Sequence, residues 1–183
     1  MKFGTVEKRQ RVPGIAGLLR ASGGGMIIEF AFVAPFVILI MMATIELSWT
    51  FFVGAALEGA AENAARQIRT GQVQQNDDPV ASFQAKLCEQ LFNLIDCTEV
   101  TFDVRGFSDF ASVSAPLEFD ENGQLIGATF TPGNSGEITL VRVLYRWKYL
   151  TPLVSEALAA DCSGTTLLLA TVAFQNEPYE LGG

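Results

Sequence analysis

The sequence places one carboxylate, that of Glu29, near the start of its longest apolar run. A charge at the centre of a membrane-spanning segment costs roughly 2.5 to 3.5 kcal/mol, and less near its ends, so such a residue indicates a function and a partner. If a peptidase cut after Gly24, Glu29 would be the fifth residue of the mature chain. The new α-amino group on a neighbouring copy would then neutralise its carboxylate. A cut at this point would therefore make Glu29 an assembly contact.

Catalytic chemistry finds little support in the sequence. The chain has no histidine, which excludes Ser-His-Asp and Cys-His arrangements, and no Gly-rich phosphate loop follows a predicted strand. Adjacent acids at Asp77–Asp78 and Asp120–Glu121 fall in predicted turns, where caps and solvated loops are more common than acid–base catalysts. The second pair lacks the EF-hand spacing for calcium. Without histidine or CxxC spacing, we expect no enzyme, cofactor or metal site.

The charge of the chain is divided between its ends. Of 183 residues with a formal net charge of −8, residues 1–24 carry five Lys/Arg and only Glu7, which leaves −12 for the remainder. A short basic flank stays in the cytoplasm under the positive-inside rule, so the acidic remainder is expected to be exported. Its seven basic residues are scattered, which argues against nucleic acid as a partner.

The apolar run itself predicts a transmembrane helix. Residues 26–53 would extend about 42 Å as a helix, more than the roughly 30 Å of a hydrocarbon core. Pro35 lies inside it, and membrane helices tolerate such a residue when neighbouring helices satisfy the freed carbonyl. An ordinary signal anchor remains an alternative. A cleaved secretory signal, cut among the small residues near Gly54–Ala56, is a weaker one because the run exceeds the usual apolar region of about 7 to 15 residues.

Helical spacing continues beyond the membrane segment. Apolar residues recur three and four positions apart at Leu57, Ala60, Ala61, Ala64 and Ile68. This stripe predicts one helix from near Met26 to Thr70, half in lipid and half packed on a folded domain, with Gly71 as its C-cap. The expected organisation is a basic leader at 1–24, a membrane helix at 25–53 and an exported domain at 54–183.

The exported domain is predicted to combine a second helix with a sheet. Asp78 and Pro79 are typical of a helix start, and the apolar pattern continues to about Ile95. Alternating residues, turn signals and, at 164–175, an apolar and β-branched run typical of a buried strand predict the other elements. These are strands at 98–107, 137–149 and 164–175, a hairpin at 116–131 turning at Asn122-Gly123, and a short helix at 153–160. We therefore expect an α+β fold in which the long helix lies against an antiparallel sheet of about four strands.

Several segments together resemble the TadE/TadG-like proteins of the type IV pilin superfamily. The resemblance covers roughly residues 20–179, apart from 108–136. Its matched processing positions are Gly24, Glu29 and Phe30; three consecutive glycines leave the cut ambiguous by one residue, and counting four residues before Glu29 places it between Gly24 and Gly25. The other shared segments are Ala34-Pro35, Ile45-Glu46-Leu47, Tyr145-x-Trp147, Thr151-Pro152 and the run from Phe174 to Tyr179.

The resemblance implies a pseudopilin or minor pilin for assembly of a tight-adherence (Flp) pilus, surface adhesion and biofilm formation. The implied partners are a prepilin peptidase, other pilins or pseudopilins, the inner-membrane assembly platform and the lipid bilayer. The implied location is the bacterial inner membrane, crossed once, with the N-terminus cytoplasmic and the domain periplasmic, or extracellular within a pilus. The alternative is an anchored cell-envelope binding domain unrelated to pili, which needs neither the cut nor the buried acid.

The cysteines suggest one disulfide. An exported domain lies in an oxidising space, and Cys88 and Cys97 lie at the second helix and just before the first strand. We expect these two to pair. Cys162 could replace either partner or stay free, and all three could instead be small buried residues.

Overall fold

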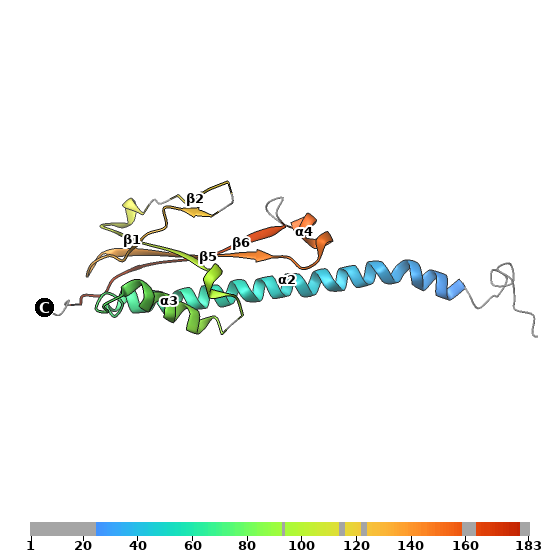
Figure 1. The fold of residues 1–183 in the computed structure, drawn as a ribbon, viewed down its shortest axis with the longest axis horizontal. Coiled ribbons are helices and arrows are strands. Elements are labelled where there is room, and N and C mark those ends of the chain that lie inside the picture. The colour runs from blue at the N-terminus through green and yellow to red at the C-terminus, as the bar shows by residue number, and fades with distance from the viewer. Residues whose placement is uncertain (1–24, 93, 114–115, 122–123, 159–163, 180–183) are drawn as a thin grey trace, which may run out of the picture. The chain divides into compact units, whose positions relative to one another are not determined.

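A computed structural model describes residues 25–92, 94–113, 116–121, 124–158 and 164–179 (Figure 1). The chain forms two units, one ending at Ala43 and the other beginning at Thr44. Helix α2, Gly25–Arg69, supplies residues to both units. Its 45 residues match the single long helix that the sequence predicts. The leader at 1–24, which includes Gly24, lies outside the described residues.

The second unit buries one stripe of α2. The five stripe residues that the sequence indicates are each at most 1% exposed. Four of the nine buried residues on α2 are alanines, which allow the sheet to approach the helix closely. Gly71 follows the helix with φ 77°, and its N–H donates to the carbonyl of Ile68 at 3.0 Å. The predicted C-cap is therefore confirmed.

The second helix, α3 (Pro79–Gln90), begins as predicted and ends earlier. The Asp78 carboxylate caps it by accepting from the Ala81 N–H at 3.0 Å. The predicted end at Ile95 is wrong because Phe92 adopts a left-handed conformation with φ 48°, which breaks the helix after Leu91. Leu91 and Ile95 are nonetheless buried, so the apolar pattern followed the core past the end of the helix.

Four strands form the main sheet in the order β4-β1-β5-β6. Strands β1 and β6 pair with the two sides of β5, both antiparallel, and β4 pairs with β1 in parallel. The strands are β1 (Thr101–Phe107), β4 (Phe130–Thr131), β5 (Ile138–Lys148) and β6 (Thr165–Gln175). The remaining elements are the β2 (Glu118–Phe119) and β3 (Leu125–Ile126) hairpin, the 3-10 turns η1 (Cys97–Glu99) and η2 (Phe110–Ser112), and α4 (Pro152–Leu158).

The predicted α+β class is confirmed, with two differences in the sheet. The hairpin forms a separate sheet of two strands, so it does not extend the main one; the expected turn at 122–123 lies outside the described residues. The main sheet is mixed, because the chain after β3 turns at Gly127, φ 68°, and returns beside β1 in the same direction. Residues 98–99, expected to begin the first strand, belong to η1.

The core lies between the sheet and the helices. Phe83 of α3 has its ring centroid 5.2 Å from that of Phe102 on β1 and 5.5 Å from that of Phe130 on β4. Along β5, Val141 and Val143 are fully buried on the same face as Phe102. Helix α3 therefore seals the β4–β1 side of this face, and the buried stripe of α2 supplies further core.

Candidate functional site

The N-terminal segment of α2 carries the residues predicted for processing and assembly. Gly25 is the first residue of the helix, and Glu29 lies about one turn later. Glu29 and Phe30 are exposed, Phe30 at 71%. Within the part of the chain that the structure describes, the Glu29 carboxylate accepts no hydrogen bond. The helix therefore presents a charged group on an otherwise apolar surface, without a bonded partner among the described residues.

The surroundings of Glu29 are apolar and open. Large aliphatic and aromatic side chains between Met26 and Ile45 are 39–80% exposed, which a soluble protein would not leave bare over such a length. Helix α2 is long and apolar enough to cross a membrane, by length and composition. About 20 residues suffice for a bilayer, so the first half of α2 meets that requirement. This segment suits a single-pass anchor.

A second acid on α2, Glu46, is buried and bound by the domain. It is 6% exposed, and its Oε1 accepts from the backbone N–H groups of Leu150 and Thr151, the latter at 3.2 Å. Both N–H groups lie immediately before α4, so the carboxylate satisfies the donors of the turn that leads into this helix. The side chain thus joins α2 to the turn between β5 and α4.

The C-terminal residues after β6 fasten the opposite end of the domain. The Asn176 amide is 2% exposed and donates to the carbonyls of Gly133 at 2.7 Å and Asn134 at 2.9 Å. Its Oδ1 accepts from the Thr139 hydroxyl at 3.3 Å. Asn176 therefore holds the loop before β5 to the end of β6.

Tyr179 and Glu177 hold the same end to α2. A Cβ on Gly71 would lie 2.6 Å from the Tyr179 ring, so the ring requires glycine at the helix cap. The Tyr179 hydroxyl donates to Gly133 O at 3.2 Å and accepts from the Gln74 amide at 3.0 Å. The Glu177 Oε1 atom lies 3.3 Å from Nε of Arg69, the last residue of α2. Glu177 and Tyr179 thus hold the C-terminal end of the domain against the end of α2.

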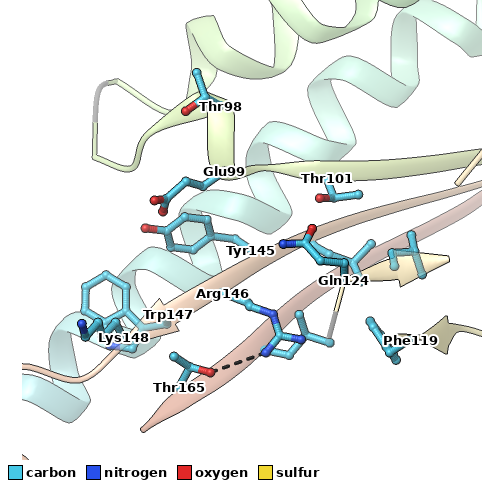
Figure 2. Close-up of a pocket in the computed structure, with 13 residues that line it drawn as sticks. Thr98, Glu99, Thr101, Phe119, Gln124, Tyr145, Arg146, Trp147, Lys148 and Thr165 are labelled. Atoms are coloured by element: carbon cyan, nitrogen blue, oxygen red, sulfur yellow. Dashed lines mark hydrogen bonds between the residues drawn. The ribbon is translucent and has the colours of Figure 1, made fainter. Parts of the chain in front are cut away.

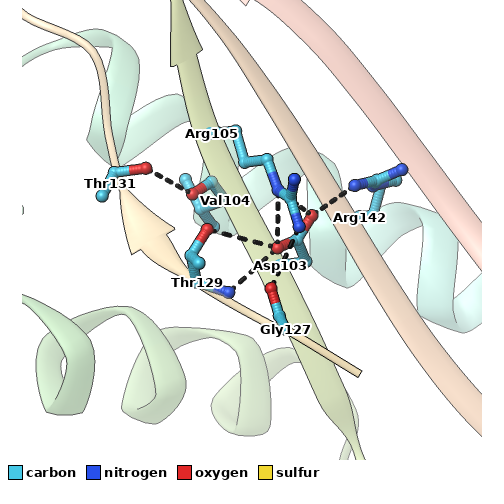
Figure 3. A network of polar contacts seen from close by, with 7 residues as sticks. All are labelled: Asp103, Val104, Arg105, Gly127, Thr129, Thr131 and Arg142. Atoms are coloured by element: carbon cyan, nitrogen blue, oxygen red, sulfur yellow. Dashed lines mark hydrogen bonds and ion pairs between the residues drawn. The ribbon is translucent and has the colours of Figure 1, made fainter. Parts of the chain in front are cut away.

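A buried ion pair crosses the other face of the sheet (Figure 3). Asp103 of β1 is fully buried and accepts from Arg142 of β5, from Arg105 Nε at 3.0 Å and from the Thr129 N–H at 2.9 Å. Burial alone would raise the pKa of Asp103, but the hydrogen bonds from Arg142, Thr129 and Arg105 outweigh it and hold the pKa below its usual value. These hydrogen bonds hold in place the segment that contains β4, which runs back beside β1.

A hollow of about 500 Å³ lies beside the ion pair, between β5 and the β2–β3 hairpin (Figure 2). Tyr145, Arg146 and Lys148 of β5 line it, with Gln124 from the hairpin and Glu99 from η1. Burial and the nearby Glu99 charge raise the pKa of the Tyr145 phenol. Acidic and basic side chains both line this hollow. Its lining residues contain no nucleophile paired with a base, so the hollow offers polar contacts and shows no catalytic arrangement.

Cys88 and Cys97 form a disulfide in the structure, with their Cα atoms 5.9 Å apart. This is the pairing that the sequence favoured. The bond ties the end of α3 to η1, immediately before β1. Cys162 lies outside the described residues.

The molecule thus combines an apolar, membrane-compatible helix with an α+β domain that packs on the second half of that helix. Residues 24–66 match the family model described as TadE-like protein, which confirms the family resemblance over this segment. The match covers Gly24, Glu29 and Glu46 as well as the apolar run. No curated protein and no solved structure matches the chain.

Sequence reasoning missed two of these sites. It quoted Glu46 only as a polar break in the apolar run and within a segment shared with the TadE/TadG-like proteins, and it set Asp103 and Arg142 opposite the apolar faces of their strands. These polar faces of β1 and β5 are covered, because Asp103 is 0% and Arg142 5% exposed. The opposite charges at facing positions of β1 and β5 were the available signal, since cross-strand partners of opposite sign attract.

Proposed function

We propose that the protein is a TadE-like pseudopilin or minor pilin that acts in the assembly of a tight-adherence (Flp) pilus and in surface adhesion. The observation that carries the proposal is the TadE-like match at residues 24–66, which spans the processing junction and the apolar helix. A TadE-like segment points to a Tad pilus-associated protein. The exposed apolar surface of α2 supports a role in which this helix lies in lipid or against other helices.

In this proposal the chain begins as an inner-membrane precursor with a cytoplasmic leader. A prepilin peptidase cuts between Gly24 and Gly25, and the domain lies in the periplasm until a pilus carries it outside. Its role is structural, through contacts with other pilins and the assembly platform. The single-pass helix is the part that the structure supports directly.

Glu29 would act after the cut. The new ammonium lies about one helical turn from the carboxylate, at similar depth in the bilayer, so an axially offset neighbour can bring its own ammonium to Glu29. In the apolar interior of the bilayer few water molecules would compete for either charge, so this pairing would be strong. Pairing would therefore favour assembly.

Intact mass of the protein from membrane and sheared-pilus fractions tests the processing step. We expect a mature chain that starts at Gly25 and, for Gly24→Arg, a longer precursor in the inner membrane, with Gly23→Ala as the control that still matures. A mature start near Ala56 would instead establish a cleaved secretory signal. An uncut chain at full length in all fractions would favour the anchored binding domain.

Cross-linking from the mature N-terminus tests the assembly contact. Glu29→Val should insert normally, because removing a charge favours the membrane, but it should lose cross-links to other pilin subunits and lose adherence. Glu29→Asp, which keeps the charge, serves as the matched control. Unchanged cross-links and full adherence in Glu29→Val would assign Glu29 another role.

A further inference from the structure

Helix α4 and the turn before it leave large apolar side chains exposed. Leu150 is 85% exposed and Leu153 is 59% exposed, whereas Val154 of the same helix is buried. Single exposed leucines are common on proteins, but apolar patches mark contacts with other proteins or with membranes. The patch in question, here called the α4 surface, comprises four exposed residues: Leu150, Pro152, Leu153 and Ala157.

Glu46 fixes the position of the α4 surface along α2. Its buried carboxylate accepts from the backbone N–H groups of Leu150 and Thr151. The far end of the domain is held to the last residue of α2 by the ion pair of Arg69 with Glu177. Positions 46 and 69 of this one helix are 23 residues apart, which is about 34 Å at a rise of roughly 1.5 Å per residue. The α4 surface therefore lies at the end of the domain where α2 enters it.

Counting along α2 places this end of the domain at the surface of a bilayer. The apolar residues from Met26 to Ile45 cover about 30 Å, which is the thickness of a hydrocarbon core. The headgroup layers bring a bilayer to about 40–45 Å, so α2 passes through the layer on the domain side over about the next four residues. Trp49 lies in that stretch and is 45% exposed, and tryptophan is enriched at membrane interfaces. Glu46, and with it the α4 surface, therefore lies where the acyl chains meet the headgroups.

Lipid is the occupant that this position provides for the α4 surface. The charged residue of α4, Glu156, is an acid, so attraction to anionic headgroups does not supply the contact. Burial of apolar side chains supplies it, because it removes leucine surface from water. Since α2 tethers α4 at the bilayer surface, the acyl chains are present there at a high effective concentration, without a separate association step. A partner protein would have to compete with that lipid.

We propose that Leu150 and Leu153 insert into the bilayer that α2 crosses, at the boundary between headgroups and acyl chains on the side of the domain. The membrane then holds the chain at two places, α2 and the α4 surface. This second contact restricts how the domain tilts and rotates about α2, so it sets which face of the domain is turned away from the membrane. The inference rests on the single-pass anchor of the proposed function, and it requires neither processing nor a pilus.

Spin-label accessibility tests this contact on the full chain in phosphatidylcholine nanodiscs that each hold one molecule. Each sample carries one label, on Ile38→Cys in the apolar run, on Leu153→Cys in α4, or on Phe110→Cys as the matched control. Cys162→Ser in every sample leaves the introduced cysteine as the labelled one, because the other two cysteines are bonded to each other. Phe110 is 65% exposed but belongs to the opposite end of the domain, because it follows the end of β1, which lies beside the start of β5 and the end of β6.

The labels report their surroundings through two reagents, oxygen, which dissolves in lipid, and a nickel chelate, which stays in water. Labels at positions 38 and 153 should respond more to oxygen, with position 153 about 5–10 Å into the boundary between headgroups and acyl chains. The label at position 110 should respond more to the nickel chelate. The lipid is uncharged, so the result depends on apolar contact alone.

The three labels separate the α4 contact from the anchor on which it rests. A label at position 38 that responds to the nickel chelate would mean that α2 does not cross the bilayer, and would overturn both. If position 38 responds to oxygen while position 153 responds to the nickel chelate, the anchor stands and the α4 contact alone is overturned. Low access of both reagents to position 153 would mean that protein covers α4, which would also overturn the contact with lipid.

Polar variants of the two leucines complete the test. Leu150→Gln together with Leu153→Gln should move a label on Ala157→Cys outward by about 5–10 Å, because the polar side chains no longer favour the acyl chains. Both leucines are exposed, so the core of the domain stays intact. Phe110→Gln, which makes the same kind of change at the other end of the domain, should leave that label in place. An unchanged depth of the label in the double variant would overturn the proposal.

Discussion

Replacing Glu46 with alanine should detach the β5–α4 turn from α2. The carboxylate is the acceptor for the backbone N–H groups of Leu150 and Thr151, and it is 6% exposed. Alanine leaves both donors without their acceptor. Glutamine keeps one acceptor oxygen, so Glu46→Gln should retain part of the contact.

The expected loss can be worked out from the two bonds. A buried donor left unsatisfied costs about 1–3 kcal/mol. The Leu150 side chain is 85% exposed, so water can reach this turn and the lower half of that range applies. For the two donors together, Glu46→Ala should therefore lose about 2–4 kcal/mol of unfolding free energy, and Glu46→Gln about 1 kcal/mol. At about 2–4 °C per kcal/mol for a chain of this size, Tm should fall by about 4–16 °C for alanine.

Thermal and denaturant unfolding of the full chain in detergent micelles measures this loss. Glu58→Ala, an exposed acid on the same helix, is the matched control and should change Tm little. If Glu46 instead faced lipid, removing its charge would leave stability unchanged or raise it. A Tm for Glu46→Ala equal to that of Glu58→Ala, or higher than wild type, would refute the reasoning.

Three further predictions concern the domain. Asp103→Asn should lose about 3 kcal/mol at neutral pH, because it removes the negative charge that the buried Arg142 bonds to. Since the folded pKa of Asp103 is lowered, its contribution is present above the ordinary pKa of about 3.9 and is lost as pH falls through the folded pKa, so the difference from wild type in urea unfolding should shrink as pH falls below about 4. Reduction of the Cys88–Cys97 bond should lower the unfolding free energy by about 2–3 kcal/mol, and non-reducing peptide mapping that joins the third cysteine to either partner would contradict the pairing. Gly71→Ala should lower Tm, because its φ is 77° and Tyr179 occupies the space of the new methyl group; the double change with Tyr179→Ala should recover the steric part, and equal Tm losses with and without Tyr179 would argue against that clash.

Local patterns in the sequence predicted most of the architecture. The spacing of apolar residues along α2 predicted one continuous helix and the five stripe residues that the domain buries, since each position depends only on the 3.6-residue period. Alternation along β5 and the apolar, β-branched composition of β6 predicted two strands that the structure confirms at 138–148 and 165–175. The junction from Gly24 to Phe30 could be predicted for the same reason, because it lies within seven consecutive residues, and it stays a prediction.

Contacts between distant residues were decided by the tertiary structure alone. Glu46 meets N–H groups 104 and 105 residues away, and Asp103 meets Arg142 39 residues away. Periodicity tells which face of a strand is polar, but it cannot tell that a later segment returns to cover that face, as the residues around Thr129 do here. Whether a charge is solvated or buried depends on that covering chain. The sequence by itself therefore determined the long helix, its apolar first half and the main strands, while the folded chain determined which acids are buried and which distant groups they bind.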